Sequence, residues 1–304
     1  MKERLLYIDA LRGFTMYLVC IGHFLNHSGY AQGNLTNFIY SFHMPLFMAI
    51  SGFVTAYTVD SSVNLDEKIS KKVQSFCLYC WKKFRTVLLP YLMWCLIAIP
   101  FFFKTYPYNV DVEKIFDTIF ISYNGLWFFP CLFGLLVCFG LFVLLKKICI
   151  KDHLLFDLFL SVIPALFVVC IYLMTHLPLL KGILSYYLPF AIGVAMGRGG
   201  SFYKAIIMNR KISDVCLIVL VLSSGYYMSA PKALIGQTAR MVCGITAIPF
   251  FFYFFYNYVK NQKITEWLSI VGRNTLIIYI YYTVGGLDLY GILKVGIWVC
   301  GLKF

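Results

Sequence analysis

Residues 126–145 read LWFFPCLFGLLVCFGLFVLL, a stretch without a single charged side chain. A bilayer core about 30 Å thick is crossed by a helix of about 20 apolar residues, so this stretch predicts a transmembrane helix. Comparable apolar runs flank it at residues 7–27, 38–59, 86–103, 154–174, 183–197, 212–229, 241–259 and 274–290, with a weaker run at 291–304. These runs are too long and continuous for barrel strands. We expect an all-α, polytopic membrane bundle of about nine or ten transmembrane helices.

The composition agrees with this fold class. Hydrophobic residues make up 61% of the 304 residues and charged residues only 13%, whereas a soluble domain is roughly half apolar and about a quarter charged. We expect one membrane-embedded domain over residues 1–304, with no separate soluble domain. The formal charge of +13 lies in short clusters between apolar runs rather than on a basic face with stacking aromatics. Nucleic acid is therefore not an expected partner.

The distribution of basic residues predicts the orientation. If the N-terminus is cytoplasmic, the cytoplasmic side carries nineteen Lys and Arg residues and the opposite loops carry five. Cytoplasmic loops of membrane proteins are enriched in these residues. The N-terminus is therefore expected on the cytoplasmic side.

The first apolar run contains ionisable residues that a membrane helix usually places in an interior cavity. Arg12 and His23 are eleven residues apart, which puts them on one helix face about 16 Å apart, with Arg12 nearer the cytoplasm. This pair suits a site that binds an anionic donor substrate near Arg12 and an acceptor hydroxyl near His23. An arginine that extends to the membrane surface and a hydrogen-bonded core histidine fit the spacing equally well. His23 and His27 have the i,i+4 spacing of a metal site, but no acidic third ligand is apparent nearby, so no metal is expected.

The second apolar run contains His43 two residues before Pro45. A proline inside a helix frees a carbonyl group and can bend the helix. His43 would lie beside that bend, where a polar side chain can face a cavity. Taken alone, this is also a common arrangement for one buried histidine in a kinked helix.

Several motifs occur together and in order along nearly the whole chain. The sequence resembles the acyltransferase 3 family of bacterial integral-membrane acyltransferases in Arg12-x10-His23, IDALRG at 8–13, FHMPLF at 42–47 with SGF at 51–53, KKFR at 82–85 with LPY at 89–91, LWFF at 126–129, and GRNTL at 272–276 with Tyr279. Tyr282 stands where relatives commonly have a histidine, and the last run is shorter than in many relatives. These departures leave open an altered acceptor choice or an inactive copy.

The resemblance implies transfer of an acyl group, acetyl by preference, from cytoplasmic acetyl-CoA to a hydroxyl or amine of an envelope glycan or lipid-linked sugar. The enzyme would lie in the bacterial inner (cytoplasmic) membrane, with acetyl-CoA as a substrate and the lipid bilayer as its surroundings. The expected catalytic residues are His23 as general base or acyl carrier, Arg12 and His43. The expected substrate- and donor-binding residues are Asp9, paired with Arg12, together with Ser51, Lys82, Lys83, Arg85 and Trp127.

Two other classes of protein remain open from the residues alone. A transporter or flippase of lipid-linked sugars would also carry polar residues in its spans, but spread over several helices. Asp157 is the one clear acidic residue deep in a later apolar run, which disfavours this reading. A catalytically silent membrane scaffold would tolerate replacement of His23.

Overall fold

The computed structural model describes residues 4–30, 33–59, 68–96, 127–149, 154–229, 233–259, 262–275 and 277–278. Within these ranges every regular element is a helix, which confirms the all-α fold class. The chain divides into two compact units, residues 1–58 with 189–304 and residues 59–188. Each unit is described by itself below.

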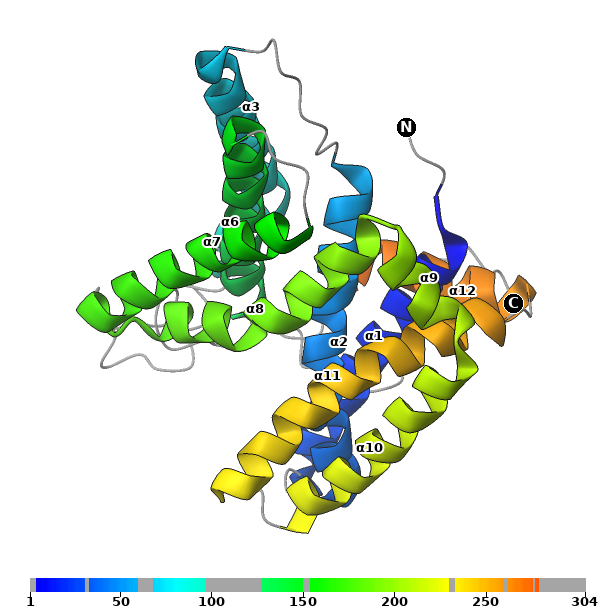
Figure 1. The fold of residues 1–304 in the computed structure, drawn as a ribbon. Helices are drawn as coiled ribbons and strands as arrows, with labels where there is room; N and C mark the ends of the chain where they lie inside the picture. The colour runs from blue at the N-terminus through cyan, green and yellow to red at the C-terminus, as the bar shows by residue number, and fades with distance from the viewer. Residues whose placement is uncertain are drawn as a thin grey trace, which may run out of the picture. The chain divides into compact units, whose positions relative to one another are not determined.

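Figure 1 shows the helices of the first unit, most of which follow predicted apolar runs. They are α1 (Leu6–Leu25), α2 (Asn34–Thr58), the second half of α8 (Pro178–Gly197), α9 (Ser201–Met208), α10 (Arg210–Ser229), α11 (Leu234–Asn257) and α12 (Gln262–Arg273). A π-helical turn at Asn26–Tyr30 continues α1. The second unit contains α3 (Ile69–Lys83), a π-helical turn at Phe84–Leu88, α6 (Phe128–Cys149), α7 (Leu154–Thr175) and the first half of α8.

Six of the described helices are long and apolar enough to cross a bilayer, namely α1, α2, α6, α8, α10 and α11. The predicted run at 86–103 extends beyond the described residues after 96, and those at 274–290 and 291–304 lie almost entirely outside them. Three further helices, α3, α9 and α12, occupy segments that the hydropathy pattern predicts as loops. Their sequences are too polar or too short to span lipid, so hydropathy alone gives no sign of them.

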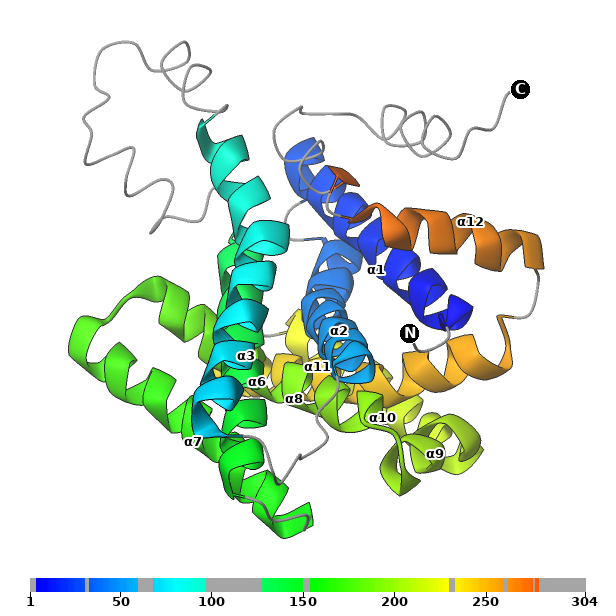
Figure 2. The same ribbon diagram turned by 90° about the horizontal axis from the view of Figure 1, so that it is seen from above.

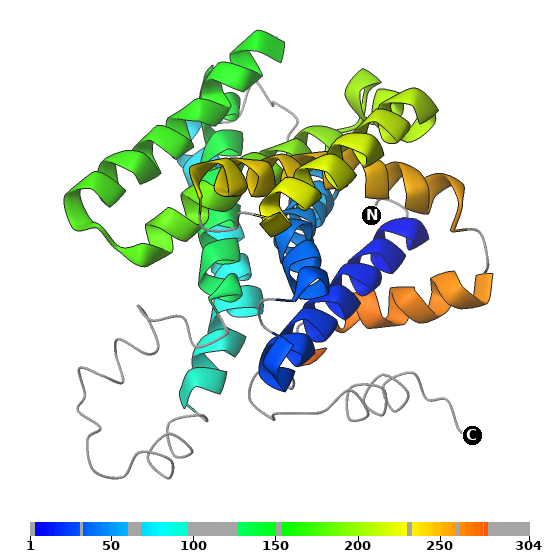
Figure 3. The ribbon, with the colours of Figure 1, turned by 90° about the horizontal axis from the view of Figure 1, so that it is seen from below.

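Glycines let the helices of the first unit approach closely. A Cβ atom on Gly13 of α1 would lie 1.9 Å from the Leu268 carbonyl oxygen of α12, and one on Gly272 would lie 1.9 Å from the Asp9 carbonyl oxygen. Helix α12 therefore runs against α1 with backbones in contact, as Figures 2 and 3 show. A Cβ atom on Gly193 of α8 would likewise lie 1.9 Å from the Ala49 carbonyl oxygen of α2. Small residues at such crossings are typical of helix packing in membranes.

The core of the first unit is apolar and is shared by six of its described helices, α1, α2, α8, α9, α10 and α11. Leu11 of α1, Leu46 and Ile50 of α2, and Ile248 and Phe252 of α11 are fully buried there, together with Met196 of α8. At the start of α1 the hydroxyl groups of Tyr7 and Tyr203 are hydrogen-bonded. Burial raises the pKa of Tyr203, which lies on α9 outside the candidate spans, so this phenol stays protonated at neutral pH. The helices that carry the candidate site residues, α1 and α2, are thus held from several sides.

Candidate active site

Arg12 enters the space between α1 and α2. Its Cζ atom lies 5.8 Å from the centre of the Phe47 ring, and Phe47 is 4% exposed. The Nε atom of Arg12 is enclosed by protein and has no hydrogen-bond partner among the described residues. A buried polar atom without a partner is rare in a folded protein and commonly marks a site for a ligand. Arg12 therefore keeps one unused hydrogen-bond donor inside the protein.

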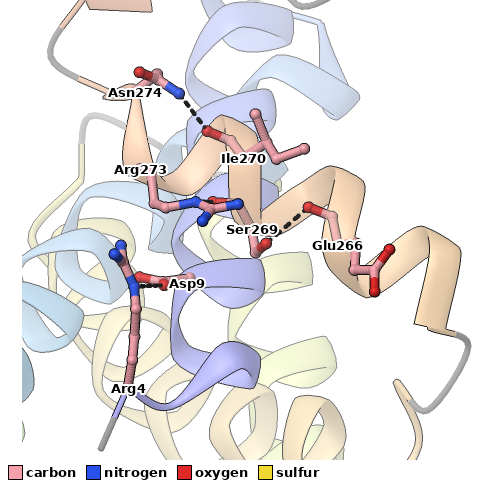
Figure 4. Close-up of polar contacts among 7 residues, drawn as sticks. All are labelled: Arg4, Asp9, Glu266, Ser269, Ile270, Arg273 and Asn274. Atoms are coloured by element: carbon pink, nitrogen blue, oxygen red, sulfur yellow. Dashed lines mark hydrogen bonds and ion pairs between the residues drawn. The ribbon is translucent and has the colours of Figure 1, made fainter. Parts of the chain in front are cut away.

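Asp9 lies one turn before Arg12 on α1 but pairs with Arg4, and not with Arg12 as expected from the sequence. The Arg4 Nε atom is 2.5 Å from Asp9 Oδ2, with the Asp9 side chain 13% exposed and that of Arg4 63% exposed. Figure 4 shows this ion pair next to the end of α12. The pair holds the Asp9 side chain at the start of the helix, one turn before Arg12.

The late motif also packs against this turn of α1. Gly272 contacts the Asp9 backbone, and Asn274 donates from Nδ2 to the Ile270 carbonyl at 2.8 Å, which satisfies the end of its own helix (Figure 4). Arg273 donates from Nε to the Ser269 carbonyl at 3.3 Å. Two motifs that are far apart in the sequence, IDALRG and GRNTL, are thus one packing unit.

His43 is 2% exposed, and its environment fixes its tautomer. Its Nδ1 atom is 2.7 Å from the Ile39 carbonyl oxygen. A carbonyl oxygen can only accept a hydrogen bond, so we assign the proton of the neutral ring to Nδ1. The Nε2 atom then carries the lone pair. In this form His43 accepts a hydrogen bond or a proton at Nε2 rather than donating one.

Tyr40 joins the two candidate histidines. Its ring centre lies 6.2 Å from that of His23, with an edge-to-face angle of 82°, and 5.1 Å from that of His43 at 57°. Gly22, next to His23, faces the same ring, since a Cβ atom there would be in ordinary contact with the Tyr40 ring at 3.6 Å. The two imidazoles therefore share one aromatic neighbour. Sequence reasoning missed Tyr40 because nothing distinguishes it from the other 22 tyrosines; the i,i+3 spacing to His43 was the available signal.

Ser51 lies two turns after His43 on α2, one turn beyond Phe47. Its Oγ atom donates to the Phe47 carbonyl at 2.9 Å, so its proton is used within the helix. The spacing i,i+4,i+8 places His43, Phe47 and Ser51 on one face of α2. Because Arg12 contacts the Phe47 ring, it lies against the middle of this face of α2.

The other four predicted residues belong to the second unit. Lys82 and Arg85 are exposed, around the junction between α3 and the π-helical turn. Lys83 is partly covered, with its Nζ atom 5.5 Å from the centre of the Tyr79 ring. Trp127 stacks on Tyr186 of α8 with ring centres 5.4 Å apart. The first three form a basic surface segment that can bind phosphate, and Trp127 has a packing role within its own unit.

Comparison with known proteins identifies the family. A family profile described as an acyltransferase domain matches residues 5–297. A nodulation protein, NolL of Sinorhizobium fredii (strain NBRC 101917 / NGR234), is 29% identical over 158 residues. That alignment covers 48% of this chain and 39% of NolL, so the chain matches about two fifths of the relative's length. No solved structure matches. The profile match over nearly the whole chain, together with the membrane-length helices, shows that this protein belongs to the acyltransferase 3 family of membrane acyltransferases.

Proposed function

We propose that the protein transfers an acyl group, preferably acetyl, from a cytoplasmic acyl-CoA to a hydroxyl or amine of an envelope glycan or lipid-linked sugar. The observation that carries this proposal is the enclosed, unpartnered Nε atom of Arg12 on the same α1 face as His23. An arginine inside a membrane bundle with an unused donor is suited to a substrate anion. Its position near the predicted cytoplasmic end of α1 favours the phosphate-bearing donor.

The reaction follows from the chemistry of the two histidines. An acceptor hydroxyl loses its proton to His23 as its oxygen attacks the thioester carbonyl carbon. The new C–O bond forms, the C–S bond breaks, and the thiolate of coenzyme A takes up the proton from His23. In the alternative route His23 first carries the acyl group on a ring nitrogen and then passes it to the acceptor.

His43 has a different role because of its tautomer. With Nδ1–H donated to Ile39, the Nε2 lone pair can accept a hydrogen bond from a second hydroxyl of the acceptor sugar, while the reacting hydroxyl donates to His23. A neutral ring in this state cannot donate a hydrogen bond to the developing oxyanion. We therefore propose His43 as the residue that orients the acceptor.

Basic residues are the donor contacts in this proposal. Arg12 would bind an anionic part of the donor with a planar fork of donors, and Lys82, Lys83 and Arg85 would attract its phosphates as charges at the cytoplasmic surface. Acetyl-CoA is thus the expected donor substrate, and the bacterial inner membrane is the expected location. Exposed basic residues also serve as plain topology signals, so their contribution to affinity is tested separately from that of Arg12.

The test is transfer of label from radiolabelled acetyl-CoA in inverted membrane vesicles supplied with a broad set of glycans. The native chain is compared with His23→Ala, Arg12→Ala and a control histidine variant, His176→Asn. His176 is exposed and has a φ of 53°, a conformation that asparagine tolerates. Label in a glycan or lipid fraction, lost in the first two variants and kept in the control, supports the proposal. Transfer that survives His23→Ala removes the assigned base.

Absence of transfer by the native chain would favour the alternative functions. A flippase of lipid-linked sugars would move a labelled lipid-linked sugar across the same vesicle membrane without acyl donor. An inactive family member would do neither. The enzyme is favoured over both because the candidate anion site and the two histidines belong to one pair of contacting helices.

A further inference from the structure

Arg240 lies on the face of α11 that carries its buried residues, just before the apolar run at residues 241–259. Cys243, Ala247 and Ile248 form a fully buried stripe along this helix, each at 0% exposure. Arg240 precedes Cys243 by three residues and Gly244 by four, so it continues the same stripe towards the start of α11. Its position is that of an inward-facing side chain, and the residue is only partly exposed.

The neighbours of Arg240 come from two other helices. Its Cζ atom lies 5.9 Å from the centre of the Tyr227 ring on α10, and Tyr227 is 7% exposed. One turn along, the Oγ atom of Ser223 on α10 and the Sγ atom of Cys243 on α11 are hydrogen-bonded at 3.1 Å. This contact fixes the register of the two helices. These two helices run side by side in Figures 1 and 3.

The same turn of α11 packs against α2 near His43. A Cβ atom on Gly244 would lie 2.7 Å from the Pro45 ring and 3.7 Å from the Ser41 carbonyl oxygen. Arg240 lies one turn before Gly244 on the same face of α11, so its side chain starts from the face that meets α2 beside His43. Arg240 therefore lies between Tyr227 and the segment of α2 that carries His43.

A structural role does not explain a cation in this place. Arginine inside a span is costly, and on the side opposite the cytoplasm it also goes against the distribution of basic residues. Among the residues that the structure describes, no carboxylate forms an ion pair with Arg240. A snorkelling arginine would leave the buried stripe instead of extending it.

We propose that Arg240 binds an acidic group of the acceptor beside His43, so that the acceptor is a saccharide carrying a carboxylate or a phosphate. This inference rests on the proposed function, since it places the acceptor at the His23–His43 end of the site and the donor at Arg12. Both anions present the paired oxygens that the guanidinium fork binds in bidentate fashion. The acid would anchor the sugar while His43 accepts a hydrogen bond from a second hydroxyl of the same sugar.

The experiment measures binding rather than turnover, so that it is independent of transfer. Purified full-length protein is titrated with three matched probes: hexyl glucoside, hexyl glucuronide, and hexyl glucoside 6-phosphate. The native chain is compared with Arg240→Gln, Arg240→Lys and the control Arg210→Gln. Arg210 is an exposed arginine on α10, paired with Asp214 at 3.5 Å, and lies at the other end of the helix from Tyr227.

We expect the native chain to bind at least one acidic probe about tenfold or more tightly than the neutral glucoside. Arg240→Gln should abolish this preference and leave binding of the neutral probe unchanged, whereas Arg240→Lys should restore part of it. The acidic probe that shows the preference identifies carboxylate or phosphate as the group bound. Equal binding of all probes by the native chain, or a preference that survives Arg240→Gln, would overturn the inference.

The outcome is distinguishable from failure of the proposed function. Loss of acidic preference in Arg240→Gln without any acyl transfer by the native chain would retain the anion subsite and remove the enzyme assignment. Acyl transfer that depends on His23, without preferential binding of an acidic probe, would retain the enzyme assignment and remove the anion subsite. Circular dichroism of each variant confirms that the helices are intact before binding is compared.

Discussion

At the scale of single residues, the Arg12 side chain is expected to lower the free energy of unfolding of the protein when no substrate is bound. Its Nε atom is enclosed without a partner, and an unsatisfied buried polar group costs about 1–3 kcal/mol. Arg12→Met should therefore unfold at the same temperature as the native chain or a higher one, while acyl transfer is lost. Thermal unfolding in one detergent, followed with the transfer assay, checks both parts. A clearly lower unfolding temperature would mean that Arg12 holds the helices together.

Tyr40 provides a second test at this scale, because its ring and its hydroxyl can be separated. Tyr40→Phe keeps the ring that contacts both His23 and His43, and should retain most activity. Tyr40→Leu removes that ring and should lower kcat by about tenfold or more, since a misplacement of about 1 Å is that costly, with little change in the KM for the donor. Tyr226→Leu, at an exposed tyrosine of α10, is the control. Equal loss in Tyr40→Phe and Tyr40→Leu would point to the hydroxyl instead.

At the scale of helices, the crossing of α1 and α12 should be intolerant of any side chain at its two glycines. A Cβ atom at Gly13 or Gly272 would meet a carbonyl oxygen at 1.9 Å, and such overpacking costs about 1–3 kcal/mol or more. Gly13→Ala and Gly272→Ala should each lower the unfolding temperature. Gly225→Ala in α10 meets nothing within 4 Å and should be neutral or stabilising by up to about 1 kcal/mol. Similar unfolding temperatures for all three variants would contradict this close packing.

The helices also show which parts of the fold hydropathy can predict. The run at residues 7–27 becomes α1 at Leu6–Leu25, and the run at 154–174 becomes α7 at Leu154–Thr175, because lipid requires continuous apolar helices of a set length. Helix α12 is amphipathic and only twelve residues long, so this requirement does not reveal it. Its place against α1 depends on backbone contact at Gly13 and Gly272, which a hydropathy pattern does not contain.

The candidate site was predictable to a similar degree. Arg12, His23 and His43 stand out because ionisable groups are rare in spans, and the structure brings all three to the paired helices α1 and α2. The Arg4–Asp9 pair and the Tyr40 contacts depend on how side chains meet across helices. Arg240 has the sequence signature of a boundary residue, and only the packing of α10, α11 and α2 places it on a buried face.

At the scale of the whole molecule, the proposed reaction requires the two ends of α1 to face different sides of the membrane. Arg12 is near the end where the donor would enter, and His23 is about 16 Å further along the helix axis. Nineteen basic residues on the predicted cytoplasmic side against five on the other favour a cytoplasmic N-terminus. The donor would then reach Arg12 from the cytoplasm, and the acceptor would meet His23 and His43 from the opposite side.

Single cysteines in a variant lacking the 11 native ones test this orientation. Lys263→Cys on α12 and Leu234→Cys at the start of α11 both replace exposed residues. A membrane-impermeant maleimide should label Lys263→Cys only in inverted vesicles and Leu234→Cys only in right-side-out vesicles, with acyl transfer confirming that each variant is folded. The reversed pattern would put Arg12 on the side without acyl-CoA. The donor site would then have to be sought at the histidine end of α1, and Arg240 would become a donor contact.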